Sequence, residues 1–322
     1  MTYEARFRPP QPGTPAPGEF TIHRSAVRDG LSLAYVREGV GGHPLLLLHG
    51  YPETKRIWWR NIAPLAAAGF EVIAPDLRGY GDSDLSPDDV YDLAVYSRDV
   101  HALVHDVLGH ERCAVAGGDI GGVVGVDLVH RFDDFVERLC FFNTVPPAAL
   151  EQYAAAGMDY GSLSALSDGP TGDYRELQGA RPDELAAMLP TPEARRQWVA
   201  GMYQSRLWAS PGTFGRADVD FMTEPFADGA KLRSGFGGYE SVFKAEKRSE
   251  SPILGPNPTH TLILFGTSDH VIYPEFDRMA ATVFADHVGP FLVRDAGHFL
   301  QWEAADVLNG AIASFCRDLR KT

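Results

Sequence analysis

Short, unbroken apolar runs constrain the fold of this chain more than any other feature of its sequence. The runs lie at residues 44–50, 70–76, 112–118, 138–144, 259–266 and 289–297. They lack the polar–apolar alternation of a half-exposed strand, and such runs are typical of a parallel sheet that is covered on both faces. We therefore predict that each run forms a strand buried on both faces.

Segments long enough for helices lie between most of these runs. They span residues 57–68, 93–108, 121–132, 274–285 and 303–319. Alternating strands and helices predict βαβ units and hence a doubly wound α/β sheet. Residues 21–40 alternate between polar and apolar side chains instead, so we predict two antiparallel strands there, with Asp29-Gly30 at the turn.

The alternation of strands and helices stops between residues 146 and 245. This region has a helical and irregular pattern, rich in Ala, Gly, Pro and aromatic residues, and no run within it resembles a buried strand. We predict a helical cap at 146–245, inserted between two parts of one sheet domain at 21–145 and 246–322. Ligands of open α/β sheets bind at the carboxyl ends of the strands, so a cap inserted there would cover the ligand site.

Composition and charge exclude several classes of protein. The formal net charge of −14 disfavours a nucleic acid as partner. No apolar stretch approaches the roughly 20 residues of a membrane span, so we expect no membrane partner. The first residues lack the apolar region of a secretory signal. The cysteines Cys113, Cys140 and Cys316 are far apart and lack metal-ligand spacing, so we expect reduced thiols and a cytoplasmic location.

The stretch AVAGGDIGG (114–122) places one carboxylate between two pairs of glycines, after a strand and before a helix. This arrangement has the shape of a nucleophile elbow, a sharp turn that holds its central side chain exposed. Gly117 and Gly121 would keep side chains out of that turn. The side chain held up is Asp119, and the amides that begin the next helix favour an anion. We therefore predict that Asp119 is an ionised nucleophile.

A carboxylate nucleophile requires a second chemical step. It displaces a leaving group from an sp3 carbon and forms an ester, which water must then hydrolyse with a base and an oxyanion hole. His298 follows the last apolar run and is the candidate base, and Asp269 follows the run before and would orient it. The resulting order of nucleophile, acid and base is that of α/β-hydrolases. Backbone N–H groups of Tyr51 and Ile120 would form the oxyanion hole.

At these residues the chain resembles the α/β-hydrolase-fold epoxide hydrolases, from about residue 20 to its end. The motifs that carry the resemblance are HGYPE (49–53), DLRGYGDSD (76–84), GGDIGG (117–122), FNTVPP (142–147), GTSDHV (266–271) and AGHFLQWE (296–303). The resemblance implies an enzyme that turns an epoxide and water into a vicinal diol through an aspartyl ester. It implies no metal and no organic cofactor. The sequence allows a homodimer without determining the oligomeric state.

The resemblance also implies two cap tyrosines that hydrogen-bond the epoxide oxygen. In the family one lies in a segment like DYRELQ and the other shortly before the triad acid. These positions correspond to Tyr174 and Tyr239 here. The assignment of Tyr239 rests on its spacing ahead of Asp269. Tyr174 lies in a stretch that aligns less clearly, so Tyr153 and Tyr160 stay open as alternatives.

The elbow departs from the family pattern in its flanking residues. Family members commonly have His-Asp-Trp there, where this chain has Gly118, Asp119 and Ile120. We expect Gly118 to leave space beside the nucleophile. Haloalkane and fluoroacetate dehalogenases share the fold and the Asp nucleophile, and dehalogenation of a haloalkane or a haloacid is the alternative function. The former hold the halide with a Trp after the nucleophile and often an Asn after His-Gly, where this chain has Ile120 and Tyr51. The latter hold the substrate carboxylate with arginines just after the elbow, where this chain reads GGVVGVD.

Each candidate residue also has a plain structural interpretation. Asp119 alone could be a solvated residue of a glycine-rich turn. Tyr174 and Tyr239 could be packed aromatics of the cap, and Asp286 and Asp295 are rivals of Asp269 as partner of the histidine. A ligand-binding relative without catalysis is the third functional hypothesis. The elbow, acid and base motifs occur together and in the order of an α/β-hydrolase, and this favours the enzyme.

Overall fold

The computed structural model describes residues 13–146, 150–158, 174–253, 255–271 and 275–320. Among these residues, eight strands form one sheet in the order β1-β2-β4-β3-β5-β6-β7-β8. The strands are β1 (Ile22–Arg28), β2 (Leu31–Glu38), β3 (His43–Leu48), β4 (Phe70–Pro75), β5 (Cys113–Gly118), β6 (Val136–Phe142), β7 (Thr261–Gly266) and β8 (His287–Val293). Every predicted apolar run is a strand.

The pairing of the strands confirms a doubly wound, mostly parallel sheet. β1 is antiparallel to β2, and β2 is antiparallel to β4. The strands from β3 to β8 are all parallel to one another and pair in the order β4-β3-β5-β6-β7-β8. The turn between β1 and β2 has positive φ at Asp29 (50°) and Gly30 (77°), as a tight hairpin turn requires. All residues of β4, β5 and β7 are buried.

The last strand differs from the prediction of burial on both faces. β8 lies at the edge of the sheet, and its Phe291 and Leu292 are exposed. An apolar run of this kind forms a strand in either position, and its place in the sheet decides how much of it is covered. The other edge is formed by β1, whose residues are exposed or half-buried.

Helices cover both faces of the sheet. They are α1 (Trp59–Ala67), α2 (Leu93–His101), α3 (Asp119–Arg131), α12 (Phe276–Val283), α13 (Leu300–Glu303) and α14 (Ala305–Phe315), and α2 continues into a π-helical turn (Ala102–Val107). β4 and β5 lie on opposite sides of β3, so right-handed crossovers put α1 on one face and α2 and α3 on the other. Accordingly α1 packs with α14, and α2 packs with α3. No described helix is both long and apolar enough to cross a lipid bilayer.

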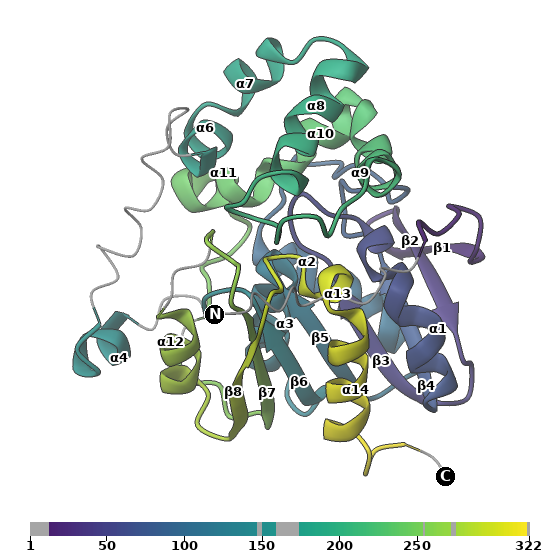
Figure 1. Cartoon of the computed structure of the whole chain (residues 1–322), viewed down its shortest axis with the longest axis vertical. Coiled ribbons are helices and arrows are strands. Elements are labelled where there is room, and N and C mark those ends of the chain that lie inside the picture. The colour runs from purple at the N-terminus through teal and green to yellow at the C-terminus, as the bar shows by residue number, and fades with distance from the viewer. Residues whose placement is uncertain (1–12, 147–149, 159–173, 254, 272–274, 321–322) are drawn as a thin grey trace, which may run out of the picture.

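A second group of helices lies over the carboxyl ends of the strands (Figure 1). It consists of α6 (Tyr174–Ala180), α7 (Pro182–Met188), α8 (Pro192–Tyr203), α9 (Arg216–Thr223), α10 (Gly229–Gly235) and α11 (Gly237–Phe243). We call this group the cap helices.

The helix α4 (Leu150–Ala155) lies apart from the cap helices, beside α12 (Figure 1). Tyr153 and Met158 pack there in a small cluster with Phe265 of β7 and Met279 of α12. This part of the predicted cap therefore packs on the sheet. The division of the chain at residues 146 and 245 stays a prediction.

Candidate active site

The turn from β5 into α3 holds Asp119 in a left-handed conformation. β5 ends at Gly118, α3 begins at Asp119, and φ of Asp119 is +48°. A Cβ atom at Gly117 would lie 2.5 Å from the backbone of Gly121, and one at Gly121 would lie 2.3 Å from the carbonyl oxygen of Leu48. The two glycines therefore let strand, helix and β3 approach closely. The turn has the shape of the predicted elbow, and it presents the carboxylate at the carboxyl end of β5.

The two oxygens of Asp119 have different surroundings. The Tyr51 N–H donates to Oδ1 at 2.7 Å, and His298 Nε2 lies 3.5 Å from Oδ2. A Cβ atom at Gly50 would lie 2.5 Å from Oδ1, so the loop after β3 can approach the carboxylate only with glycine there. The N–H of Ile120 belongs to the first turn of α3, where amides have no partner within the helix. Oδ1 thus accepts from one backbone N–H and Oδ2 faces the imidazole.

His298 lies between two carboxylates. Its Nδ1 is 2.9 Å from Asp269 Oδ2, and both side chains are fully buried. The rival Asp286 pairs with His260 at 2.7 Å instead, and Asp295 is exposed. Of the three acids considered from the sequence, Asp269 is the one that the structure brings to the histidine.

The charge state of His298 follows from this position. Burial opposes a charge on the ring, but the carboxylates of Asp269 and Asp119 outweigh it and raise the pKa of His298 well above its ordinary value. We therefore expect an imidazolium between two carboxylates while Asp119 is ionised. Removal of either negative charge would lower that pKa.

Glu303 holds the loop that carries His298. Its carboxylate accepts from Gly297 N–H at 2.9 Å and from Phe299 N–H at 3.1 Å, the two amides that flank His298. It also accepts from Ser210 N–H at 2.8 Å, in the loop between α8 and α9. Burial raises the pKa of Glu303 to about 7, although these amides oppose the shift. One buried carboxyl therefore fixes the histidine loop and ties it to the cap.

Asn143, just after β6, joins the same loop to the sheet. Its φ is +44°, its Nδ2 donates to the carbonyl oxygens of Gly297 (2.6 Å) and His298 (3.0 Å), and its Oδ1 accepts from Gly266 N–H at 2.8 Å. Its three hydrogen bonds give it a structural role, in which the ends of β6 and β7 and the histidine loop are held together.

Glu53, the last residue of HGYPE, holds the loop that carries Tyr51. Its Oε2 accepts from Gly50 N–H at 2.6 Å, and its Oε1 accepts from Gln301 Nε2 at 2.8 Å. Burial raises the pKa of Glu53 to about 7, with the Gly50 hydrogen bond opposing the shift. The position of the neighbouring Tyr51 N–H therefore depends on a second buried carboxyl.

The roles of Asn143, Glu303 and Glu53 did not emerge from the sequence. Each residue stands inside a motif that carries the family resemblance, which is the one signal that could have found them. The motifs mark these positions, but only the folded chain supplies their partners.

The two expected cap tyrosines lie together over the site. The rings of Tyr174 and Tyr239 meet edge to face with centroids 5.9 Å apart. Tyr239 contacts Tyr51 (5.5 Å), Tyr174 contacts Trp208 (5.2 Å), and Trp208 contacts His298 (4.9 Å). Aromatic rings thus form a continuous wall from the oxyanion loop to the histidine.

The hydroxyl of Tyr239 is a hydrogen-bond donor at neutral pH. Burial raises its pKa well above 10, and the nearby Tyr174 and Asp119 add to the shift. The alternative Tyr153 lies elsewhere, in α4, and its hydroxyl donates to the carbonyl oxygen of Pro146 at 2.8 Å. Tyr160 lies outside the described residues. The geometry thus favours Tyr174 over Tyr153 as the neighbour of Tyr239.

The expectation that Gly118 leaves space beside the nucleophile is wrong. A Cβ atom there would lie 2.4 Å from the ring of Phe142 at the end of β6. The ring of Phe142 is fully buried and meets Trp58 edge to face at 5.9 Å. A ring from the neighbouring strand fills the volume that a side chain at position 118 would occupy.

Comparisons with known proteins show the family and the fold of this chain. The sequence model of the family described as alpha/beta hydrolase fold matches residues 43–305. The soluble epoxide hydrolase of a Corynebacterium species is 41% identical over 314 residues, which are 92% of this chain and 98% of that protein. Epoxide hydrolase A of Mycobacterium tuberculosis is 29% identical, over 94% of this chain and 98% of that protein. The solved structure of the ligand-free epoxide hydrolase CorEH superposes with a TM-score of 0.80 at 25% identity, over 94% of this chain and 100% of that one.

These similarities extend through sheet, elbow and cap alike, since each covers more than nine-tenths of both chains. They confirm the resemblance and the fold class that the sequence predicts. The chain therefore belongs to the α/β-hydrolase fold family and, within it, to the epoxide hydrolases.

Proposed function

We propose that this protein converts an epoxide into a vicinal diol through a covalent ester on Asp119. The observation that carries the proposal is the unequal setting of the two Asp119 oxygens. Oδ1 accepts from the Tyr51 N–H, and Oδ2 lies 3.5 Å from His298 Nε2. The oxygen that stays in the oxyanion hole becomes the ester carbonyl, so Oδ2 is the nucleophile.

In the first step Oδ2 of Asp119 attacks one carbon of the epoxide, and the bond from that carbon to the ring oxygen breaks. Tyr174 and Tyr239 hydrogen-bond the ring oxygen. One of them gives its proton to the developing alkoxide and becomes a phenolate, which then regains a proton from the imidazolium of His298. This transfer leaves a hydroxyalkyl ester on Asp119 and a neutral imidazole.

Loss of the Asp119 charge prepares His298 for the second step. The ester is neutral, so one of the two carboxylates that raise the pKa of His298 no longer does so. The neutral imidazole, oriented by Asp269, takes a proton from water as the water oxygen attacks the ester carbonyl carbon. The negative charge that forms on Oδ1 is held by the N–H groups of Tyr51 and Ile120. Cleavage of the ester releases the diol and restores the carboxylate and the imidazolium.

An isotope experiment tests this mechanism. One turnover is run in water labelled with heavy oxygen, and the peptide that contains Asp119 is analysed by mass spectrometry. Because water attacks the carbonyl carbon of the ester, we expect one labelled oxygen in Asp119 and unlabelled diol. Label that enters the diol alone in this single turnover would show direct attack of water on the epoxide.

Assays of halide release from haloalkanes and haloacids, beside diol formation from epoxides, test the alternative function. The position after the nucleophile is Ile120, which offers no indole N–H to a halide. We therefore expect diol formation to exceed halide release. A chain that forms no covalent adduct with any epoxide would instead be the ligand-binding relative without catalysis.

We also propose a reducing compartment such as the cytoplasm. The three cysteines are free and buried, and disulfides are rare in such compartments. The partners that the proposed reaction requires are a small-molecule epoxide and water. A homodimer stays a prediction, which sedimentation would test.

A further inference from the structure

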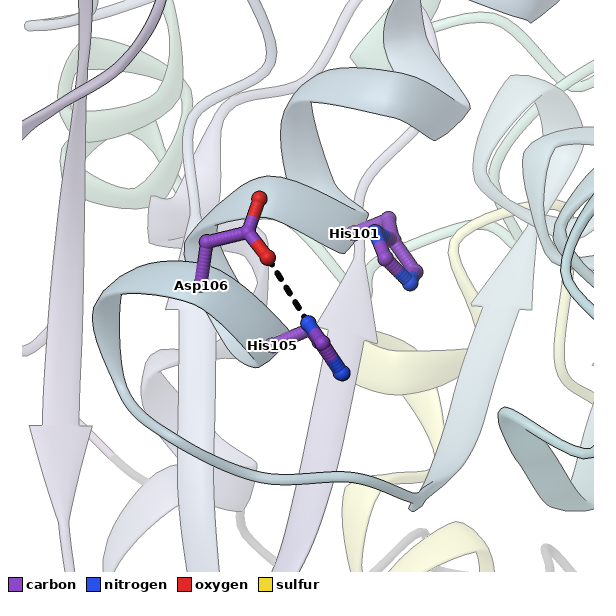
Figure 2. A group of neighbouring side chains, drawn as sticks. All are labelled: His101, His105 and Asp106. Atoms are coloured by element: carbon purple, nitrogen blue, oxygen red, sulfur yellow. Dashed lines mark hydrogen bonds and ion pairs between the residues drawn. The ribbon is translucent and has the colours of Figure 1, made fainter.

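A cluster of metal-ligand side chains lies outside the active site, at the end of α2. His101 is the last residue of α2, and His105 and Asp106 lie in the π-helical turn that follows (Figure 2). One ligand atom of each lies within 4.8 Å of the other two. Among the residues that the structure describes, it is the one set of three His, Cys, Asp or Glu donors found this close together.

The two imidazoles are held in a fixed, nearly parallel arrangement. The rings of His101 and His105 stack with centroids 4.9 Å apart and planes 18° apart. The other face of His101 stacks on Phe132 at 3.7 Å and 9°, with Phe135 at 4.6 Å. His105 Nδ1 pairs with Asp106 Oδ1 at 2.7 Å. Because neighbours already hold the rings, binding of a shared ligand would cost little side-chain entropy.

The backbone supplies an independent observation. Residues Ala102–Val107 form a π-helical turn, and Leu108 N–H donates to Leu103 O, five residues earlier. Such turns are rare, and they occur frequently at functional sites. Here the turn carries two of the three ligands, and both of their side chains are exposed.

We propose that His101, His105 and Asp106 form a binding site for a divalent transition-metal ion of the zinc and copper class. Imidazole nitrogen suits these ions, and the carboxylate adds a third donor and a negative charge. Water would complete the coordination. When the ion binds His105 Nδ1, the hydrogen bond from this ring to Asp106 Oδ1 is lost and the imidazole carries its proton on Nε2, because a coordinating nitrogen carries no hydrogen.

The position of the cluster separates it from the proposed reaction. His101 stacks on Phe132 and meets Phe135 at a tilt, and both lie just before β6, so the cluster lies at the amino ends of the strands. Asp119 lies at the opposite, carboxyl ends of the strands, just after β5. An ion here would tie the end of α2 to the π-helical turn. It would stabilise the fold, since it binds a site that unfolding destroys, and would leave diol formation unchanged.

The test is a calorimetric titration of the full chain, free of any affinity tag and stripped with a chelator, with Zn²⁺ alone. We expect one Zn²⁺ per chain at this site and a higher melting temperature in its presence. His105→Gln and Asp106→Asn should each weaken Zn²⁺ binding by about tenfold or more, since even the loss of a residue that only hydrogen-bonds a ligand weakens metal binding by about that much. Both positions are exposed, so neither variant should fail to fold. With Cu²⁺, electron paramagnetic resonance should show two imidazole nitrogens, and one after His105→Gln.

His260 provides a matched control. It also pairs with an aspartate, Asp286, at 2.7 Å and stacks on Phe315 at 4.9 Å, but among the described residues it belongs to no group of three such donors. His260→Gln should leave Zn²⁺ affinity and the Cu²⁺ spectrum unchanged. The proposal is overturned if the wild-type chain binds no Zn²⁺. Equal binding by the wild-type chain and by His105→Gln, or equal weakening by His260→Gln, would overturn it as well.

Discussion

The active site has a sheet side and a cap side, and the two are held in place by different interactions. On the sheet side, Asp119, His298 and Asp269 follow the ends of strands and are joined by short polar contacts in a buried setting. On the cap side, Tyr174 and Tyr239 lie in helices and meet their neighbours through aromatic rings. Buried hydrogen bonds specify one geometry, whereas ring contacts of this kind tolerate small shifts.

The difference indicates how the work of the site is divided. In the proposed mechanism the sheet side forms and breaks the ester, for which atoms must be placed to within a fraction of an ångström. The cap side hydrogen-bonds one oxygen through two hydroxyls, so either can compensate in part for the other. We therefore expect substitutions on the sheet side to stop the reaction and those on the cap side to slow it.

Asp119→Asn removes the proposed nucleophile and should have the largest effect of any substitution on the sheet side. An amide cannot attack the epoxide, so we expect diol formation to fall by about 10⁴-fold or more, as for loss of other catalytic nucleophiles. Steady-state assays on an epoxide panel measure this. Asp133→Asn, an exposed position after the same helix, is the matched control and should retain full activity. If Asp119→Asn keeps wild-type turnover, the proposed mechanism is wrong.

His298→Gln should separate the two steps of the reaction. Opening of the epoxide uses the Asp119 carboxylate and a proton from a cap tyrosine, but hydrolysis of the ester needs His298 as base, so we expect the ester to accumulate. Mass spectrometry of the intact protein should show a gain equal to one epoxide. The neighbouring His270 is exposed, and His270→Gln should turn over without accumulation. Free, unmodified His298→Gln enzyme after mixing with epoxide would show that the attack on the epoxide itself requires this histidine.

Much of the sheet side was predictable because local sequence determines it. The glycines around Asp119 are needed wherever a strand turns sharply into a helix beside another strand. The apolar runs give the strand ends, and the carboxyl ends of parallel strands meet at one edge. The order of Asp119, Asp269 and His298 along the chain then brings them together without any further assumption.

The partners that hold this geometry were not predictable, because they come from distant parts of the chain. Glu303 accepts from an amide 93 residues away, and Asn143 accepts from one 123 residues away. The contact of the Phe142 ring with Gly118 was not predictable either, because the two residues lie in different strands. The location of α4 beside α12 also depends on tertiary packing, which helical periodicity does not encode.

Tyr239→Phe and Tyr174→Phe test the cap side. Each removes one hydroxyl and keeps the ring contacts, so we expect diol formation to fall by about 10²-fold, the range for loss of one oxyanion donor. The double variant should lose more than either single one. Tyr153→Phe is the control, because its hydroxyl donates to Pro146 O and not to the site. Equal losses for the control and Tyr174→Phe would remove Tyr174 from the proposal.

Glu303→Gln tests the point at which the two sides meet. An amide offers one acceptor oxygen in place of two and sets an NH2 group against backbone N–H donors. We expect a loss of about 2 kcal/mol in the free energy of unfolding, the scale of a buried unsatisfied group. Urea unfolding measures it. Because the change also loosens the His298 loop, ester hydrolysis should slow more than ester formation. Equal slowing of both steps would indicate a purely structural role.

Glu53→Gln should have the smallest effect on stability. The new amide oxygen can accept from Gly50 N–H, and the amide of Gln301, whose Oε1 is buried without a hydrogen-bond partner, can turn to accept from the new NH2 group.

The substitution should act mainly on pH dependence. Burial raises the pKa of Glu53 from 4.5 to about 7, so the folded chain binds this proton more tightly than the unfolded chain. That share of the stability is present below pH 4.5 and is lost as the pH rises to about 7. The variant should therefore lose less stability than the wild-type chain over this interval, in urea unfolding at several pH values. Identical pH profiles for the two proteins would show that Glu53 does not hold its proton more tightly in the folded state.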